Sequence, residues 1–254
     1  MNIETVRSQL KNVKLYTAAR ELDQVLTKHK KAVSLSWISE LLEREVDARA
    51  EAALIARIKR ANFPEITTIE TFDWSFNPDI KESQIRELTT LNFIGSNQIC
   101  LFLGQPGTGK THLALAIGVL AANKGYRVYC TSLKRLAKDI LQARCKNTLD
   151  ALFKKILSAK LWIFDDWGVT TMSREIAEEI FDLLDRRKYS SAMILTSNRD
   201  IDEWPQVFPD PVLANATIDR IFDRAEISLF KGQSYRLKGK IEIKGSSLKG
   251  KTRS

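Results

Sequence analysis

Residues 104–111 read Gly-Gln-Pro-Gly-Thr-Gly-Lys-Thr, which fits the spacing Gly-x-x-x-x-Gly-Lys-Ser/Thr. Glycines in such a loop let backbone N–H groups turn toward a phosphate, and a helix that begins there adds the positive end of its dipole. Lys110 could reach the β and γ phosphates of a nucleotide, and the Thr111 hydroxyl could bind Mg²⁺. The predicted nucleotide-binding residues are Gly104, Gln105, Pro106, Gly107, Thr108, Gly109, Lys110, Thr111 and His112.

A second motif places two carboxylates at the end of an apolar run, Leu-Trp-Ile-Phe followed by Asp165 and Asp166. A buried strand that ends in acids suits a phosphate site, because ligands of parallel sheets bind beyond the carboxyl ends of the strands. Asp165 would bind Mg²⁺, in the usual case through a water of the ion. Asp166 would orient or deprotonate the attacking water.

The third motif is Thr-Ser-Asn at residues 196–198, at the end of the next apolar run. A short polar side chain in that place could hold the attacking water between the acid and the γ-phosphate. We therefore expect Asn198 to contribute to the same site.

Phosphoryl transfer is also accelerated by an arginine guanidinium that stabilises the negative charge of the transition state. A neighbouring subunit often supplies this arginine. Arg220 follows the third motif within Asp-Arg-Ile-Phe-Asp-Arg and is the leading candidate, with Arg224 second. Weaker candidates are Arg174, Arg186 and Arg187.

Alternating strands and helices must position these side chains. Apolar runs predict strands at residues 98–103, 127–130, 161–164, 192–196 and 225–230. Helical patterns lie at 81–94, 110–123, 132–144, 148–158, 173–188 and 215–222. Such alternation with short connections predicts an α/β fold, a parallel sheet with helices on both faces.

The chain divides into three predicted parts. Residues 1–64 form a small helical domain, since apolar residues recur at three and four positions up to the break at Phe63 and Pro64. Residues 65–238 form the nucleotide-binding domain. Aromatic residues at 72, 74 and 76 are expected to pack in its core or at the nucleotide pocket rather than stack on nucleic-acid bases. Residues 239–254 form a basic tail.

Composition excludes several classes of protein. Among 254 residues, 44% are hydrophobic and 28% charged, the mixture of a globular protein rather than of a disordered or membrane-spanning chain. No signal peptide is evident, and three scattered cysteines form no disulfide framework or metal pair, so we expect a reducing, cytoplasmic location. Two histidines make a zinc site improbable.

The net charge of +9 is concentrated at the two ends. Residues 1–60 hold 12 basic and 8 acidic side chains, and residues 231–254 hold 8 basic and 1 acidic. Basic ends without amphipathic anchors favour nucleic acid over a membrane as the partner.

The motifs together resemble IstB, the helper ATPase of insertion-sequence transposons. The resemblance covers about residues 35–238 and includes Phe-Asp-Trp-Ser-Phe at 72–76, His-Leu-Ala at 112–114, Asp-Asp-Trp-Gly at 165–168 and Gly-Gln-Ser-Tyr-Arg at 232–236. It implies an AAA+ fold that binds ATP and Mg²⁺, assembles as a homo-oligomer on duplex DNA and delivers target DNA to a partner transposase. It also implies a bacterial, cytoplasmic protein.

The family pattern assigns roles by position. Asp165 takes the role of the metal-binding acid, Asn198 that of the sensor and Arg220 that of an arginine finger. One departure is Asp166, where AAA+ proteins usually have glutamate. We expect the shorter side chain to affect the rate of ATP hydrolysis rather than ATP binding. The second is that too little chain follows Arg220 for a full helical lid, so no lid arginine is expected to act on ATP within the same subunit.

Contacts to DNA are expected between the second strand and the paired acids. The helical insertion there is where initiator-type AAA+ proteins meet DNA. Basic side chains would bind phosphates without reading sequence. The candidates are Lys134, Arg135, Lys138, Arg144 and Lys146.

Two alternatives remain open. A helicase loader of the DnaC type is the nearest, and it would favour single-stranded DNA. A small-molecule kinase uses the same kind of phosphate loop, but it would act as a monomer indifferent to DNA. The arginine suited to a neighbouring subunit and the basic ends argue against a kinase.

Overall fold

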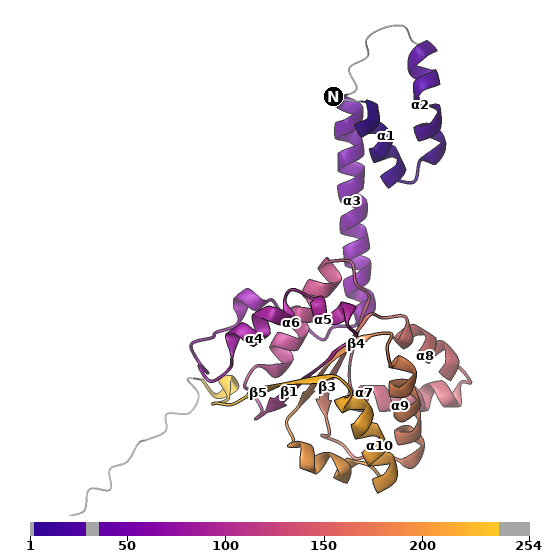
Figure 1. Ribbon diagram of the computed structural model, residues 1–254. Coiled ribbons are helices and arrows are strands. Elements are labelled where there is room, and N and C mark those ends of the chain that lie inside the picture. Colours follow the sequence, from indigo (N-terminus) through magenta and orange to yellow (C-terminus); the bar gives the residue numbers. More distant parts are fainter. Residues whose placement is uncertain (1–2, 29–35, 239–254) are drawn as a thin grey trace, which may run out of the picture. The chain divides into compact units, whose positions relative to one another are not determined.

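The computed structural model describes residues 3–28 and 36–238, and the chain divides into two compact units, residues 1–59 and 60–254 (Figure 1). The first unit contains α1 (Ile3–Asn12), α2 (Tyr16–Lys28) and α3 (Ser36–Ala61), the last of which runs into the second unit. The three helices and the turn between α1 and α2 contribute the residues of its small core, which are Val6, Leu10, Val13, Ala19 and Leu42.

The second unit is built on five parallel strands in the order β2-β3-β4-β1-β5. The strands are β1 (Ile99–Gly104), β2 (Val128–Ser132), β3 (Leu161–Trp167), β4 (Ala192–Ser197) and β5 (Ala225–Phe230). β1, β3 and β4 lie in the middle of the sheet and are almost wholly buried up to their carboxyl ends. Continuous apolar runs form these strands because both faces of the sheet are covered.

Helices form a layer on each face of this sheet (Figure 1). α4 (Glu82–Leu88), α5 (Asn92–Gly95) and α6 (Lys110–Asn123) cover one face. α7 (Leu133–Cys145), α8 (Leu149–Leu157), α9 (Arg174–Arg187) and α10 (Pro211–Phe222) cover the other. Short 3₁₀ turns complete the unit: η1 (Ile69–Thr71), η2 (Ile201–Val207) and η3 (Tyr235–Leu237). The predicted α/β fold with a parallel sheet is confirmed.

Most predicted boundaries lie within two residues of those in the structure, and three elements differ more. The single helix expected at 81–94 is two helices, because Leu91 adopts a left-handed backbone with φ 63° between α4 and α5. β3 continues through the two acids to Trp167. α10 begins at Pro211 rather than at 215, because the Asp210 side chain caps its first turn.

The strand order decides where the motifs meet. β4 lies between β1 and β3, and all three run in the same direction. The loop after β1, the acids of β3 and the residues after β4 therefore emerge side by side at one edge of the sheet. No helix in the described part of the chain is long and apolar enough to cross a membrane.

Candidate nucleotide-binding site

The loop between β1 and α6 has the backbone of a phosphate cradle. Gly107 and Gly109 have φ of 79° and 101°, a region that glycine reaches without the cost that a side chain imposes. A β-carbon at Gly109 would also collide with the Phe72 ring. α6 begins at the next residue, Lys110, so its free N–H groups face the loop.

Lys110 is held inside this loop and is only 4% exposed. Its Nζ donates to the carbonyl oxygens of Gly104 at 2.8 Å and Gln105 at 2.7 Å. Burial lowers the pKa of Lys110 to about 8, although the charges of Asp166 and Asp165 oppose the shift. A phosphate that replaced the two carbonyls would give the ammonium a charged partner.

The two acids of β3 have different partners. The Thr111 hydroxyl donates to Asp165 Oδ1 at 2.7 Å, so the pair expected to bind Mg²⁺ is already assembled. Asn198 Nδ2 donates to Asp166 Oδ1 at 3.1 Å. Loss of hydration, followed by the nearby charge of Asp165, raises the pKa of Asp166.

A pocket of about 280 Å³ lies between these side chains. Its predicted members come from the loop, β3 and the residue after β4: Pro106, Gly107, Gly109, Lys110, Thr111, His112, Asp166 and Asn198. Glu65, Tyr235 and Arg236 also line it and were not predicted. A helical lid is not the only source of an arginine from the same subunit, because Arg236 lines the pocket from the turn η3.

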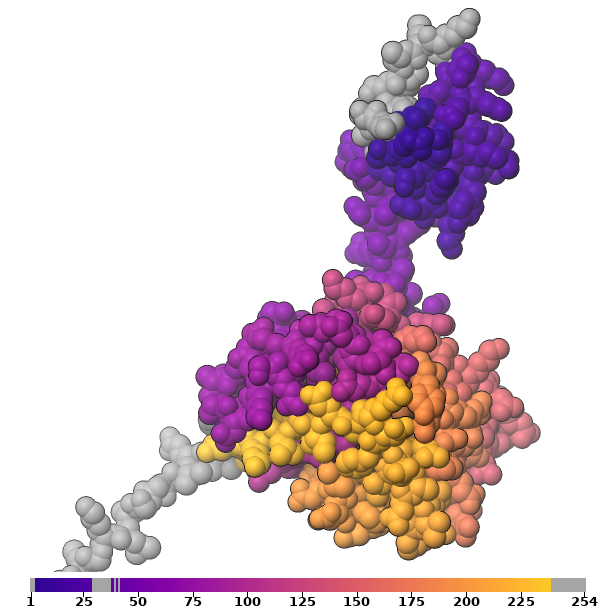
Figure 2. Space-filling view, viewed as in Figure 1, coloured from indigo at the N-terminus to yellow at the C-terminus, as the bar shows by residue number. Residues whose placement is uncertain are grey.

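Two of the unpredicted residues, Tyr235 and Arg236, belong to a C-terminal segment that contacts the loop. Tyr235 N–H donates to the Gly107 carbonyl at 2.9 Å. The Asn77 side chain accepts from Gln233 N–H at 2.9 Å and donates to the Gln233 carbonyl at 3.0 Å. Figure 2 shows the yellow surface of this C-terminal segment beside the magenta surface of residues that precede β1. In the sequence, residues 232–236 stood out only through the family resemblance. Their spacing does not by itself predict a chemical role.

A second cavity, of about 130 Å³, adjoins the loop and has three aromatic side chains in its lining. Phe72, Phe76 and Tyr235 line it together with Thr108, Gly109 and His112. The His112 ring lies 5.7 Å from Phe72 and its Nε2 lies 3.1 Å from the Thr68 carbonyl. The expected packing of the aromatic segment at the nucleotide pocket agrees with this geometry, and the cavity could hold a flat heterocyclic ring beside the phosphate pocket.

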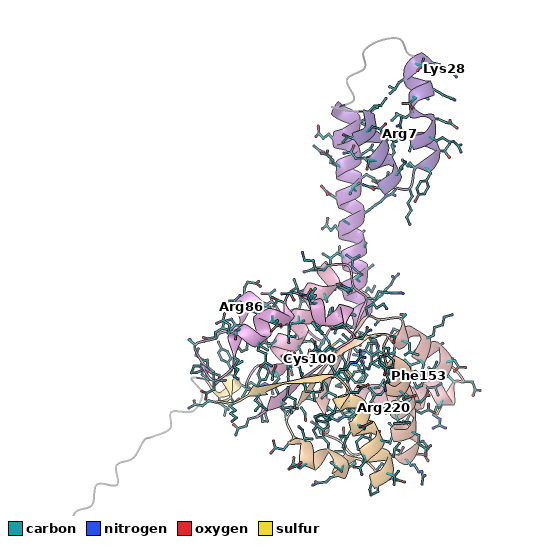
Figure 3. The ribbon with its side chains drawn as sticks, viewed as in Figure 1. Arg7, Lys28, Arg86, Cys100, Phe153 and Arg220 are labelled. Carbon is teal, nitrogen blue, oxygen red and sulfur yellow. The ribbon has the colours of Figure 1, made fainter. Side chains whose placement is uncertain are left out.

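Arg220 does not line the pocket. It lies on α10, on the same side of the sheet as α9 (Figure 3). Its Nε donates to Asp185 of α9 at 2.6 Å, and its Nη1 donates to Asp219 at 3.2 Å. An action of Arg220 on ATP would therefore concern the site of a neighbouring subunit.

The other arginine candidates also lie outside the pocket. Arg187 is 4% exposed and donates to the Ser191 carbonyl at 2.6 Å, which leaves it unable to reach a neighbour. Arg174 and Arg186 pair with acids on their own helix. The Arg224 guanidinium lies over the Tyr189 ring at 5.0 Å.

Three of the five predicted DNA-contacting residues come together on α7. Lys134, Arg135 and Lys138 line one surface hollow at the start of this helix. Arg144 lies at the other end of the helix, 3.6 Å from Glu179 of α9, and Lys146 follows the helix. All five are exposed.

The donors present suit a magnesium-bound nucleoside triphosphate. Backbone N–H groups and the cations of Lys110 and Arg236 line the phosphate pocket. The Thr111 hydroxyl and the Asp165 carboxylate, which are both oxygen ligands, lie together at its edge. Mg²⁺ would be held by Thr111 and Asp165, and when bound it would neutralise phosphate charge.

Residues 5–243 match the family described as IstB-like ATP-binding protein. This match extends over far more than half of the chain. The chain belongs to the IstB-like ATP-binding protein family.

Curated IstB-like relatives support the assignment. The ATP-binding protein of insertion sequence IS21 from Pseudomonas aeruginosa is 39% identical over 199 residues, which are 78% of this chain and 75% of the relative. The corresponding protein of IS232 from Bacillus thuringiensis is 32% identical over 92% of this chain and 95% of the relative.

Solved structures share the fold of the IstB-like chain. AMPPCP-bound DnaA from Aquifex aeolicus matches with a TM-score of 0.54 and 20% identity, over 73% of this chain and 58% of that one. DnaI matches with a TM-score of 0.52 and 19% identity, over 66% and 89%. The predicted AAA+ fold is thereby confirmed.

Proposed function

We propose that this protein is an ATPase that assembles on duplex DNA with ATP and delivers target DNA to a partner transposase. The ATPase activity is inferred mainly from the hydrogen bond between the Thr111 hydroxyl and Asp165, 2.7 Å long. This pair lies beside a pocket that is lined by Lys110, Asp166 and Asn198. The insertion-sequence names of the relatives support the transposition part.

Each residue has a defined part in the proposed hydrolysis. Lys110 holds the β and γ phosphates, and Thr111 and Asp165 hold Mg²⁺. Asp166 accepts a proton from the attacking water or orients it, and Asn198 keeps the Asp166 carboxylate in place through the bond at 3.1 Å. Arg236, which lines the same pocket, adds positive charge within the subunit.

ATP is proposed to lie at the interface between subunits. Arg220 lies outside its own pocket and is 30% exposed as a side chain, so it can meet the γ-phosphate of a neighbour. Its hydrogen bond to Asp185 holds the guanidinium between α10 and α9. ATP would then join the subunits, and hydrolysis would release or remodel the assembly.

The basic hollow on α7 is the proposed contact to the DNA backbone. Lys134, Arg135 and Lys138 present three positive charges over one small area. They would bind phosphates without reading bases, which suits a helper that accepts many target sequences.

Sedimentation of the purified protein with ATP, or with a slowly hydrolysed analogue, tests the whole proposal. We expect assembly on duplex DNA that requires nucleotide and weakens as salt rises. Lys138→Ala should flatten the plot of log affinity against log salt by about 0.9 for each lost phosphate contact. Lys124→Ala is the matched control, because it removes an exposed lysine at the end of α6, on the other face of the sheet from α7.

Other outcomes of this experiment would redirect the assignment. A preference for single strands would indicate a helicase loader. A monomer that ignores both forms of DNA would leave a small-molecule kinase as the better explanation. Unchanged salt dependence in Lys138→Ala would remove α7 from the DNA contact.

A further inference from the structure

A bulge interrupts the pairing of β3 with β4 at the two acids. Phe164 lies opposite Leu195 and Trp167 lies opposite Ser197, so three steps along β3 span two steps along β4. Asp166 has a left-handed backbone with φ 55° inside this bulge. Residues in a bulge lose regular ladder partners, and a left-handed aspartate persists only where its surroundings hold it.

The hydroxyl of Thr196 occupies the gap left by the bulge. It accepts a hydrogen bond from Asp166 N–H at 3.1 Å and donates its proton to Asp165 Oδ1 at 2.6 Å. Thr196 is 1% exposed, so water does not compete for these bonds. A hydroxyl has one proton to donate and lone pairs to accept, and both capacities are used here.

Asp165 is thereby oriented through a single oxygen. Thr196 and Thr111 both donate to Oδ1, at 2.6 Å and 2.7 Å. Oδ2 accepts no hydrogen bond from the part of the chain that the structure describes. The hydroxyls of Thr111 and Thr196 therefore restrict the orientation of the Asp165 carboxylate through Oδ1. Its other oxygen, Oδ2, stays available to a cation or to a water of that cation.

We propose that Thr196 is a positioning residue that sets Asp165 and the Asp166 backbone for Mg²⁺ and the attacking water. This inference rests on the proposed ATPase function and goes beyond it, because Thr196 does not line the phosphate pocket. Groups that orient metal ligands from behind affect metal affinity about 10- to 100-fold.

The hydroxyl and the methyl group of Thr196 can be separated by substitution. Thr196→Val keeps the shape and β-branching, but it leaves Asp166 N–H without its acceptor and leaves Asp165 Oδ1 with Thr111 as its remaining hydroxyl donor. Thr196→Ser keeps the hydroxyl and removes only the methyl group. Thr217→Val is the matched control, because Thr217 is also fully buried and its hydroxyl bonds only the Leu213 carbonyl within α10.

Binding of the fluorescent analogue mant-ATP, titrated against MgCl₂, gives a readout that does not depend on turnover. We expect Thr196→Val to raise the Mg²⁺ concentration at half-saturation at least about tenfold. Its affinity for mant-ATP without Mg²⁺ should stay within about twofold of wild type, since the phosphate loop is untouched. Thr196→Ser should return the Mg²⁺ half-saturation to near the wild-type value, and Thr217→Val should not move it.

Two results would overturn the inference: a wild-type Mg²⁺ requirement in Thr196→Val, or a Thr196→Ser variant as defective as Thr196→Val. Circular dichroism identifies variants that fail to fold, and Thr196→Ala then replaces Thr196→Val in the same comparison. Failure of the proposed function has a different signature, because wild-type protein would then bind no mant-ATP at any Mg²⁺ concentration.

Discussion

At the scale of single residues, Lys110 shows how a phosphate loop holds a positive charge inside the protein. Its ammonium is buried and rests on two loop carbonyls, which are weaker partners than phosphate oxygens. Burial lowers its pKa to about 8, so the free protein loses this charge in a mildly alkaline solution.

ATP affinity should therefore fall as pH rises through 8. Binding needs the charged ammonium, and the free protein deprotonates near pH 8. Between pH 7.5 and 9 the affinity should decrease about eightfold, as the protonated fraction does. Fluorescence titration with mant-ATP in the absence of Mg²⁺ measures this. Lys110→Arg stays charged, so its affinity should be constant over the same range. A flat wild-type profile would contradict the buried, depressed lysine.

At the scale of elements, α10 illustrates how a helix start positions a distant side chain. Asp210 Oδ1 accepts from Val212 N–H at 2.7 Å and from Leu213 N–H at 3.3 Å, and Pro211 occupies the first turn. The cap sets where the helix begins and hence which face carries Arg220 toward Asp185 of α9.

Asp210→Ala should destabilise the second unit by about 1 kcal/mol, because two N–H groups lose their acceptor. Urea denaturation followed by tryptophan fluorescence measures the change, since Trp167 and Trp204 are fully buried in this unit. Asp202→Ala removes an exposed aspartate that caps no α-helix and should change stability by less than about 0.5 kcal/mol. Equal effects of the two substitutions would contradict the capping role.

At the level of the whole molecule, the proposed role of Arg220 would give one chain the halves of two different sites. The phosphate pocket contains Lys110 and Arg236, whereas Arg220 lies outside it on α10. A subunit that must borrow an arginine hydrolyses ATP only next to another subunit. The rate of ATP hydrolysis would then depend on assembly of the subunits. Such a dependence suits a protein that is proposed to act after it has assembled on DNA.

Arg220→Ala should keep ATP binding and lower turnover at least about 1000-fold, the scale of an arginine finger. Lys110→Ala should lose ATP binding but still offer Arg220 to a neighbour. A mixture of the two variants should therefore recover turnover that neither has alone, measured as phosphate release. Arg224→Ala is the control and should hydrolyse ATP normally. Normal turnover in Arg220→Ala, or no recovery on mixing, would reject the action of Arg220 on a neighbour.

The phosphate loop, the paired acids and the α/β fold could all be predicted from the amino-acid sequence. These features are local, because glycine spacing, strand runs and helix patterns depend on residues a few positions apart. The order of motifs along the chain was enough to associate Lys110, Asp165 and Asn198 with one site, since carboxyl ends of parallel strands share an edge.

The surroundings of those residues depend on how distant segments pack. Arg236 reaches the pocket because a segment after β5 crosses the loop, and Thr196 faces the acids because a bulge opens beside it. Thr196 belongs to the third motif, but the motif gave a role only to Asn198, and Arg236 belongs to no spacing that predicts chemistry. Each acts through contacts with residues far away in sequence. Side-chain types set what a group can bind, but packing between distant segments sets which groups meet.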